Sequence, residues 1–169
     1  KGVAVNAYLQ STSNPKIYAA GDAADTQGAP LTPVAVFEGK VAASNMLKGN
    51  RTKPDYSGVP SAVFTVPELT RVGMLEQDAR EAGHDIRVVE NDTGDWYSNL
   101  RVGESCAATK VIIDKDSDTI LGAHLLGPEY GEIINFFGLA IRLGLTTSDL
   151  KKMVSVYPSV GSDLGSMLS

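Results

Sequence analysis

The pattern of hydrophobic and polar positions divides this chain of 169 residues into two segments of different character. In the first, residues 17–22 are short and mostly apolar and follow the turn residues Ser13-Asn14-Pro15, so they are predicted to form a buried strand. Residues 33–47 carry apolar side chains at helical spacing, and Gly49 is a natural stop for that helix. The first fifty residues are therefore expected to hold a strand followed by a helix.

A break in the pattern lies between residues 50 and 60, where Pro54, Gly58 and Pro60 stand among charged residues. Prolines and glycines at this density interrupt both helices and strands. The break is the best candidate for a domain boundary, and it separates residues 1–50 from residues 51–169.

Beyond the break, short strand patterns alternate with helical ones, which indicates an α+β fold with an antiparallel sheet flanked by helices. Strands are predicted at residues 61–66, 71–74, 85–90, 106–113 and 119–126. Helices are predicted at residues 76–82, 129–143 and 147–153, and a last helical stretch runs to about residue 168. Residues 96–101 are amphipathic and fit neither class well.

The longest of these helices, residues 129–143, is apolar around most of its circumference. Its large apolar side chains are Ile133, Ile134, Phe136, Phe137, Leu139, Ile141 and Leu143. Such a helix is buried on more than one side. The sequence leaves two arrangements open, burial wholly within one chain or burial between the sheet and a partner subunit.

Charge and composition argue against several partners and compartments. The net charge is −5 and no run of Lys or Arg occurs, so neither nucleic acid nor an anionic membrane surface is expected as a partner. No apolar stretch is long enough to cross a bilayer, and no signal peptide is present. The single cysteine, Cys106, fits a reducing, cytoplasmic location. Because the chain begins at Lys1, we interpret it as a fragment of a longer protein.

Candidate chemistry is concentrated where the predicted strand ends and the first helix begins. The strand ends on Gly21-Asp22, where a carboxylate can accept hydrogen bonds from ligand hydroxyls and the glycine lets a ligand approach the backbone. Thr32 is a good N-cap, and Pro33 suits the first helical position. The free N–H groups and the positive end of the helix dipole would then point back toward the ligand.

These two runs resemble the second FAD-binding motif of the pyridine nucleotide-disulfide oxidoreductases, a family that includes glutathione reductase, lipoamide dehydrogenase and mercuric reductase. The resemblance implies that Gly21 and Asp22 belong to the FAD site, with Asp22 binding the flavin ribityl hydroxyls. It also implies that the run Leu31-Thr32-Pro33 lies against the isoalloxazine, with the helix dipole facing its N1/O2 edge.

The second segment resembles the dimerisation domain of the same family. The matching runs are Phe64-Thr65-Val66-Pro67-Glu68 and the hairpin at residues 120–128, whereas residues 91–105 match least well. The resemblance implies that residues 1–50 are the end of an FAD-binding domain and that residues 51–169 form the dimerisation domain of a homodimer. It thereby favours a partner subunit beside the helix at residues 129–143.

Several parts of the family's machinery are missing from this sequence. No G-x-G-x-x-G run occurs, and the redox-active cysteine pair of the family is absent. The resemblance implies a parent enzyme that passes electrons from NAD(P)H through FAD to a small-molecule disulfide or related acceptor. The fragment alone is expected to be inactive and to lack bound cofactor.

The end of the chain departs from the family pattern in an informative way. Relatives such as glutathione reductase carry a catalytic His-Pro followed by a Glu, whereas here the His position is Tyr157 and the Glu position is Ser162, with Asp163 next. A phenol titrates near ~10, against ~6.5 for imidazole, so it is suited to donating a hydrogen bond rather than to shuttling protons. Tyr157 and Asp163 are the candidate catalytic residues, and the alternative for Tyr157 is a packing role alone.

Tyrosine at this position is also found in mercuric reductases and in coenzyme A-disulfide reductase and NADH oxidase relatives. Mercuric reductases carry a cysteine pair in the C-terminal tail. Residues 160–169 contain no cysteine, which argues against a mercuric reductase. The alternatives are therefore an enzyme of the coenzyme A-disulfide reductase or NADH oxidase type, or an inactive stand-alone dimerisation module. The sequence preceding Lys1 would discriminate among these possibilities.

No metal site is predicted. The run of Asp114, Asp116 and Asp118 begins like a calcium-binding loop, but the glycine and the closing glutamate that such a loop needs are missing. We expect a solvated hairpin turn there instead. His84 is expected at the surface, His124 is expected to be a structural histidine, and Cys106 is expected to be an inert strand residue.

Overall fold

The structure is a computed structural model that describes residues 2–169. The chain forms two compact units, which divide between Tyr56 and Ser57. None of the helices in residues 2–169 has the length and apolar character needed to span a membrane.

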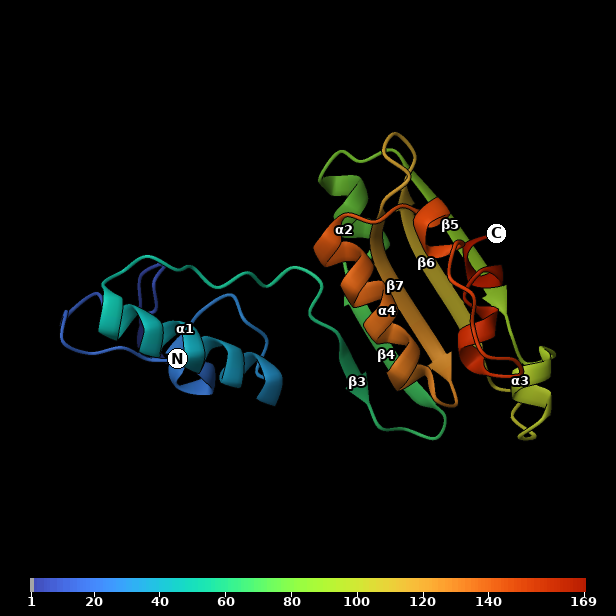
Figure 1. Ribbon diagram of the computed structural model, residues 1–169, viewed down its shortest axis with the longest axis horizontal. Helices are drawn as coiled ribbons and strands as arrows, with labels where there is room; N and C mark the ends of the chain where they lie inside the picture. Colours follow the sequence, from blue (N-terminus) through green and yellow to red (C-terminus); the bar gives the residue numbers. More distant parts are fainter. Residues whose placement is uncertain (1) are drawn as a thin grey trace. The chain divides into compact units, whose positions relative to one another are not determined.

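The N-terminal unit is built around one long helix, α1, at Thr32–Lys48, drawn in cyan in Figure 1. Two short strands, β1 at Val3–Ala4 and β2 at Ala24–Asp25, pair in parallel, and the 3-10 helix η1 at Gly21–Ala23 precedes β2. Leu9, Val41 and Ala42 form a small buried core between the loops and α1. The long helix therefore supplies one side of this core.

The strand predicted at residues 17–22 is wrong. Residues 17–20 are extended but make only a single bridge, between Gln10 and Tyr18, and Ile17 is 47% exposed. Their ladder is short because the backbone bonds reach back only to the neighbouring loop, as in the bond from the Ala19 N–H to the Leu9 carbonyl. At Gly21 the positive φ of 63° turns the chain into η1.

Helix α1 is confirmed, but its first residue differs from the prediction. Leu31 is the extended N-cap residue and its side chain makes no cap bond, so Thr32 is already helical and is not the N-cap. Pro33 still lies in the first turn, where its missing N–H is not needed. The sequence is therefore compatible with a helix that starts at Thr32 as well as with one that starts at Pro33. Gly49 ends the helix with a φ of 78°, as predicted.

The C-terminal unit is a five-stranded antiparallel sheet in the order β3-β4-β7-β6-β5, which confirms the predicted fold class (Figure 1). The strands are β3 at Ser61–Val63, β4 at Glu68–Gly73, β5 at Ile86–Asp92, β6 at Ala108–Asp114 and β7 at Ile120–Gly127. The hairpin predicted from the sequence is formed by β6 and β7, which pair within the sheet.

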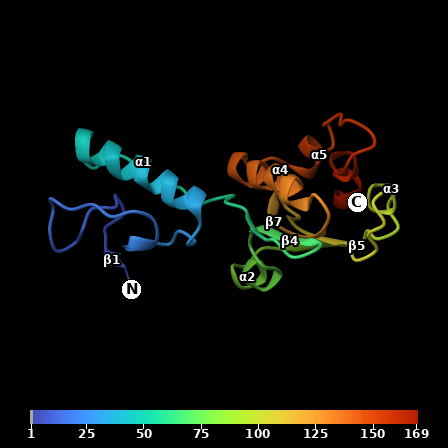
Figure 2. The ribbon, with the colours of Figure 1, turned by 90° about the horizontal axis from the view of Figure 1, so that it is seen from below.

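Helices cover the two faces of this sheet unequally. Figure 2 shows α4 at Tyr130–Leu143 and α5 at Thr147–Leu150 on one face, and α2 at Glu76–Glu81 on the other. Residues 97–100 form the short helix α3. The main core lies under α4, where Phe137 packs with the sheet residues Val111 and Ala123.

The last helical stretch of the prediction is only partly helical. It consists of two 3-10 turns, η2 at Val160–Asp163 and η3 at Ser166–Leu168, separated from α5 by irregular chain. Its apolar residues Leu164, Met167 and Leu168 are buried in the main core. The anchoring of these side chains, rather than a continuous helix, fixes the C-terminal segment.

Helix α4 is not buried on every side within one chain. Ile133, Ile134 and Phe137 are buried against the sheet. On the outer side Phe136, Leu139 and Leu143 remain exposed, and Leu139 is 52% exposed. Within the C-terminal unit, α4 is therefore buried on one side only, and its outer side is open to another surface.

Candidate functional site

The two runs predicted to meet at a ligand site lie together in the N-terminal unit. Gly21 and Asp22 line a cavity of about 190 Å³ with Pro30 and Val34, which flank the start of α1. The cavity is therefore formed by the η1 turn on one side and the first turn of α1 on the other. Leu31, Thr32 and Pro33 lie at that helix start.

Gly21 is required by this geometry for two reasons. Its φ of 63° lies in the left-handed region that favours glycine. A Cβ atom at this position would also lie 2.7 Å from the Cβ of Ala35, because α1 packs directly against the turn. Glycine thus allows the turn to come within contact distance of the helix.

Asp22 and the first turn of α1 both present unused polar groups. Asp22 is exposed, and no group within residues 2–169 forms a hydrogen bond or ion pair with its carboxylate. Thr32 and Pro33 are exposed, and no side chain caps the helix. A free carboxylate beside a helix N-terminus offers hydrogen-bond acceptors and donors side by side.

Glu38 is a residue of this region that the sequence analysis missed. Its carboxylate is fully buried and accepts hydrogen bonds from the Gly21 N–H at 2.6 Å, the Thr26 hydroxyl at 2.8 Å and the Tyr56 hydroxyl at 2.6 Å. Burial, with a smaller contribution from Glu38, raises the pKa of Tyr56 to about 12. The sequence did hold a signal that could have identified Glu38. It lies at helical spacing between Val34 and Val41, so it falls on the buried face of α1.

The two candidate catalytic residues of the C-terminal unit both contact α3. The exposed ring of Tyr157 stacks on Tyr97, with 6.3 Å between the centroids. The Asp163 carboxylate accepts a hydrogen bond from Ser98. Within residues 2–169 no hydrogen bond joins Tyr157 to Asp163, so the structure connects them through α3 rather than directly. Ser162 instead bonds the backbone of Ser159.

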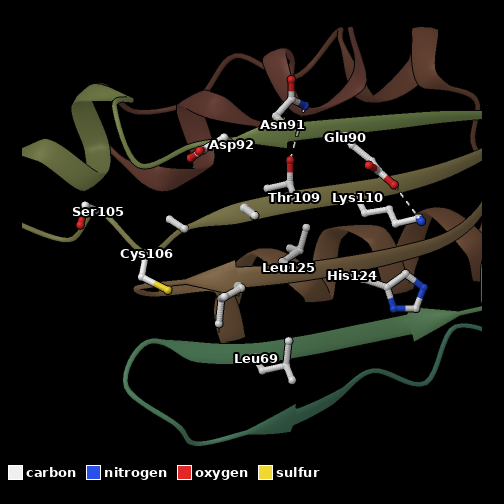
Figure 3. Close-up of a pocket in the computed structure, with 13 residues that line it drawn as sticks. Leu69, Glu90, Asn91, Asp92, Ser105, Cys106, Thr109, Lys110, His124 and Leu125 are labelled. Atoms are coloured by element: carbon white, nitrogen blue, oxygen red, sulfur yellow. Dashed lines mark hydrogen bonds and ion pairs between the residues drawn. The ribbon is translucent and has the colours of Figure 1, made fainter.

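Cys106 is exposed and precedes β6, so the prediction of a strand residue is wrong. It lies at one end of a groove of about 540 Å³ on the sheet face opposite α4, with Lys110 and His124 farther along (Figure 3). Lys110 pairs with Glu76 at 2.6 Å and with Glu90 at 2.8 Å, which raises the Lys110 pKa.

Both histidines have structural partners. His124 Nε2 lies 3.1 Å from the Met74 carbonyl oxygen, and burial lowers the pKa of this imidazole. His84 was expected at the surface but is only partly exposed, with its Nδ1 2.7 Å from the Asp114 carboxylate. Among residues 2–169 no group of His, Cys, Asp and Glu side chains is arranged to hold a metal ion.

Asp114 organises the hairpin turn that imitates a calcium-binding loop. Its Oδ1 accepts hydrogen bonds from the Asp116 and Ser117 N–H groups and from the Ser117 hydroxyl. The pKa of Asp114 is lowered to about 2. The largest cause is the hydrogen bond from the Ser117 N–H, and the next is the hydrogen bond with His84. The carboxylate therefore closes the turn.

Residues 59–167 match the family described as pyridine nucleotide-disulphide oxidoreductase, dimerisation domain. The chain is 53% identical to an uncharacterised 19.7 kDa protein of a mercuric resistance operon in Staphylococcus aureus, over 99% of this chain and 93% of that protein. It is 34% identical to the chloroplastic/mitochondrial glutathione reductase of Pisum sativum, over 98% of this chain but only 29% of the enzyme.

Among solved structures, the chain resembles the HOCl-induced flavoprotein disulfide reductase RclA from Escherichia coli. The TM-score is 0.86 at 31% sequence identity, and the match covers 97% of this chain and 37% of RclA. The chain thus spans about a third of the length of these reductases, and nearly all of the short staphylococcal protein.

Proposed function

Because the chain belongs to the pyridine nucleotide-disulphide oxidoreductases, we propose that it is the C-terminal part of an FAD-dependent enzyme of this family. The parent enzyme passes electrons from NAD(P)H through FAD to a small-molecule disulfide or related acceptor. In this proposal the N-terminal unit is the end of the FAD-binding domain, and the C-terminal unit is the dimerisation domain. The whole enzyme acts in the cytoplasm and does not bind nucleic acid or membranes.

The observation that carries the proposal is the exposed Asp22 carboxylate, which has no partner within residues 2–169, beside the uncapped start of α1. These groups fit one edge of a flavin, because a carboxylate accepts hydrogen bonds from ribityl hydroxyls and a helix N-terminus favours negative charge. Gly21 leaves the turn without a side chain where the helix packs on it. The bound flavin would supply the relay between hydride transfer and thiol chemistry.

The residues of this chain have distinct tasks in that reaction. With the flavin bound, Asp22 would hold and orient the ribityl chain, and Leu31 and Pro33 would shield part of the ring system from water. The N-terminal dipole of α1, with Thr32 in its first turn, would favour negative charge on a group bound there. This edge is one side of a site whose other parts lie outside these residues, so we expect the chain alone to be colourless.

Tyr157 is proposed to act near the thiols of the partner subunit. It is 73% exposed and its ring stacks on Tyr97, so its hydroxyl is available to a second molecule. A protonated phenol there donates a hydrogen bond to a thiolate or to the acceptor. Asp163, bonded to Ser98, fixes the segment that follows Tyr157.

The homodimer of this proposal uses the outer side of α4. Phe136, Leu139 and Leu143 form an exposed apolar strip on a helix whose other side is in the core. Two-fold dimers are the commonest assemblies of soluble proteins, and such a dimer would bury this strip. The dimer would also bring Tyr157 of each subunit to the active site of its partner.

A second candidate is a stand-alone module that dimerises without redox activity. It is favoured by the staphylococcal relative, which has a mass of 19.7 kDa and is matched over 93% of its length. The operon in which that relative is found connects it to mercuric resistance. In this alternative the flavin edge and Tyr157 have no catalytic task.

The natural polypeptide distinguishes the two candidates. Its intact mass, its flavin absorbance and the sequence of any segment before Lys1 should be determined after isolation with an antibody raised against this chain. A longer, yellow protein with two cysteines spaced C-x-x-x-x-C before Lys1 supports the disulfide reductase. A lone cysteine there indicates the coenzyme A-disulfide reductase or NADH oxidase class. A colourless protein of about this length supports the stand-alone module.

A further inference from the structure

Glu38 is a charged residue with an exposed fraction of 0%. Burial of a carboxylate is costly unless hydrogen bonds compensate it, and here three donors converge on its two oxygens. Glu38 projects from α1 toward the η1 turn, and Gly28 packs so closely that a Cβ there would lie 2.7 Å from Oε1. The carboxylate is thus confined to one position.

One of these bonds holds the backbone that carries Asp22. The Glu38 Oε2 atom accepts the Gly21 N–H at 2.6 Å, and Gly21 immediately precedes Asp22. The other oxygen takes the hydroxyls of Thr26 and Tyr56, which come from the segments that follow η1 and α1. The turn, the loop after it and the end of the unit are therefore tied to one point on α1.

We propose that Glu38 is a positioning residue for the flavin edge. Its buried carboxylate fixes the Gly21–Asp22 turn against the first turns of α1, so that the Asp22 carboxylate stands where ribityl hydroxyls can reach it. Glu38 lines the same cavity, but its two oxygens are occupied by the Gly21 N–H and by the Thr26 and Tyr56 hydroxyls, so it acts through Asp22. The inference rests on the proposed function, because it takes the ligand to be a flavin.

The test uses the isotope-labelled chain of 169 residues and two readouts. The first is hydrogen exchange of the Gly21 amide, and the second is the shift of the Asp22 and Val34 amide resonances when FAD is added. Glu38→Met keeps the size and removes the oxygen acceptors, whereas Glu38→Gln keeps one acceptor for Gly21. Tyr56→Phe removes a donor from the other oxygen only.

Asn45 offers a matched control on the same helix. It is buried and bonds the backbone of Tyr8, Arg51 and Thr52, away from Asp22. Asn45→Leu should lower the thermal stability without changing Gly21 exchange or FAD affinity, because its bonds fix a different part of the unit.

Glu38→Met should speed Gly21 exchange and weaken FAD binding, each by about ten- to a hundredfold, because a hydrogen bond to a charged group is lost. Glu38→Gln should lie between this variant and the wild type, and Tyr56→Phe should stay close to the wild type. If Glu38→Met does not fold, the same two readouts on Glu38→Gln decide.

Two results would overturn the inference: Gly21 exchange that is unchanged in both Glu38 variants, or a loss of FAD affinity in Asn45→Leu equal to that in Glu38→Met. A wild-type chain that shows no response to FAD agrees with its holding only one edge of the site, and FAD retention by the full-length parent then tests that edge. The order of Gly21 exchange rates would then decide alone whether Glu38 holds the turn.

Discussion

The ring of Tyr157 stacks on the ring of Tyr97, with 6.3 Å between the centroids and 19° between the planes. The pair joins a residue of the C-terminal segment to α3, and Ser98, the next residue of α3, bonds Asp163. The part of the sequence that resembles the family least therefore supports both candidate catalytic residues.

Removal of the Tyr157 hydroxyl should slow reduction of the acceptor in the parent enzyme. Tyr157→Phe keeps the ring and its stack but loses a hydrogen bond to a charged group, so this step should slow by about ten- to a hundredfold. Flavin reduction by NAD(P)H should stay near the wild-type rate, and rapid-mixing kinetics separates the two steps. Tyr97→Phe is the control, because it keeps the stack and both steps. Wild-type rates for both steps in Tyr157→Phe would leave Tyr157 with a packing role only.

A charge on the outer side of α4 should dissociate the dimer. Leu139→Glu places a carboxylate at both copies of a two-fold interface and removes about 1.5–3 kcal/mol of apolar burial from each, so dimerisation should weaken by roughly a hundredfold or more. Light scattering across a dilution series measures the change. Met46→Glu on α1, where Met46 is 63% exposed, should leave the dimer intact. A wild-type chain that stays monomeric at high concentration would remove the interface.

Acid should destabilise the C-terminal unit through Asp114. The Ser117 N–H and His84 lower the pKa of Asp114 from 3.8 to about 2, so the charged form is favoured in the fold. Its contribution to stability is present above about pH 4, the range in which the unfolded carboxyl is ionised, and is lost as the pH falls toward about 2. Asp114→Asn should have a lower melting temperature at neutral pH and a shallower fall between about pH 4 and 2. Parallel curves of melting temperature against pH for the wild type and Asp114→Asn would show that Asp114 does not contribute to the pH dependence of stability.

Tyr56 should remain protonated well above the pH at which a free phenol ionises. Burial, followed by the bond to Glu38, raises its pKa from 10.0 to about 12, so its contribution to stability should be lost as the pH rises from 10 to 12. Spectra of isotope-labelled tyrosine follow this titration directly. In Glu38→Gln the pKa of Tyr56 should fall, because the neighbouring negative charge is gone. An unchanged pKa in that variant would leave burial as the only cause.

The sequence predicted the elements that depend on local signals. Gly49 ends α1, and the turn at residues 114–119 joins β6 to β7, because glycine conformation and polar turn residues act over a few positions. The meeting of Gly21 with the start of α1 was also predicted, from the family resemblance and from the chemistry of a glycine followed by a carboxylate. The cavity lined by Gly21, Asp22, Pro30 and Val34 is formed at that meeting.

The features that the sequence did not predict depend on distant contacts. A strand at residues 17–22 would need partner strands, whereas the backbone of residues 17–20 pairs with the loop at residues 9–11. A glutamate in a helix is normally expected at the surface. Glu38 is buried because Gly21, Thr26 and Tyr56, which are distant in the sequence, donate hydrogen bonds to it. The role of α3 could not be predicted either, because a four-residue helix has almost no periodicity to detect.

Flavin retention by the parent protein tests the central claim most directly. The full-length protein and its Asp22→Ala variant should be purified side by side, and the flavin bound per chain measured from the absorbance spectrum and by release on denaturation. We predict close to one FAD per chain in the wild type and an affinity about ten- to a hundredfold weaker in Asp22→Ala, because the ribityl hydroxyls lose a charged acceptor. A wild-type protein without flavin, or an Asp22→Ala protein that retains flavin as tightly as the wild type, would contradict the account.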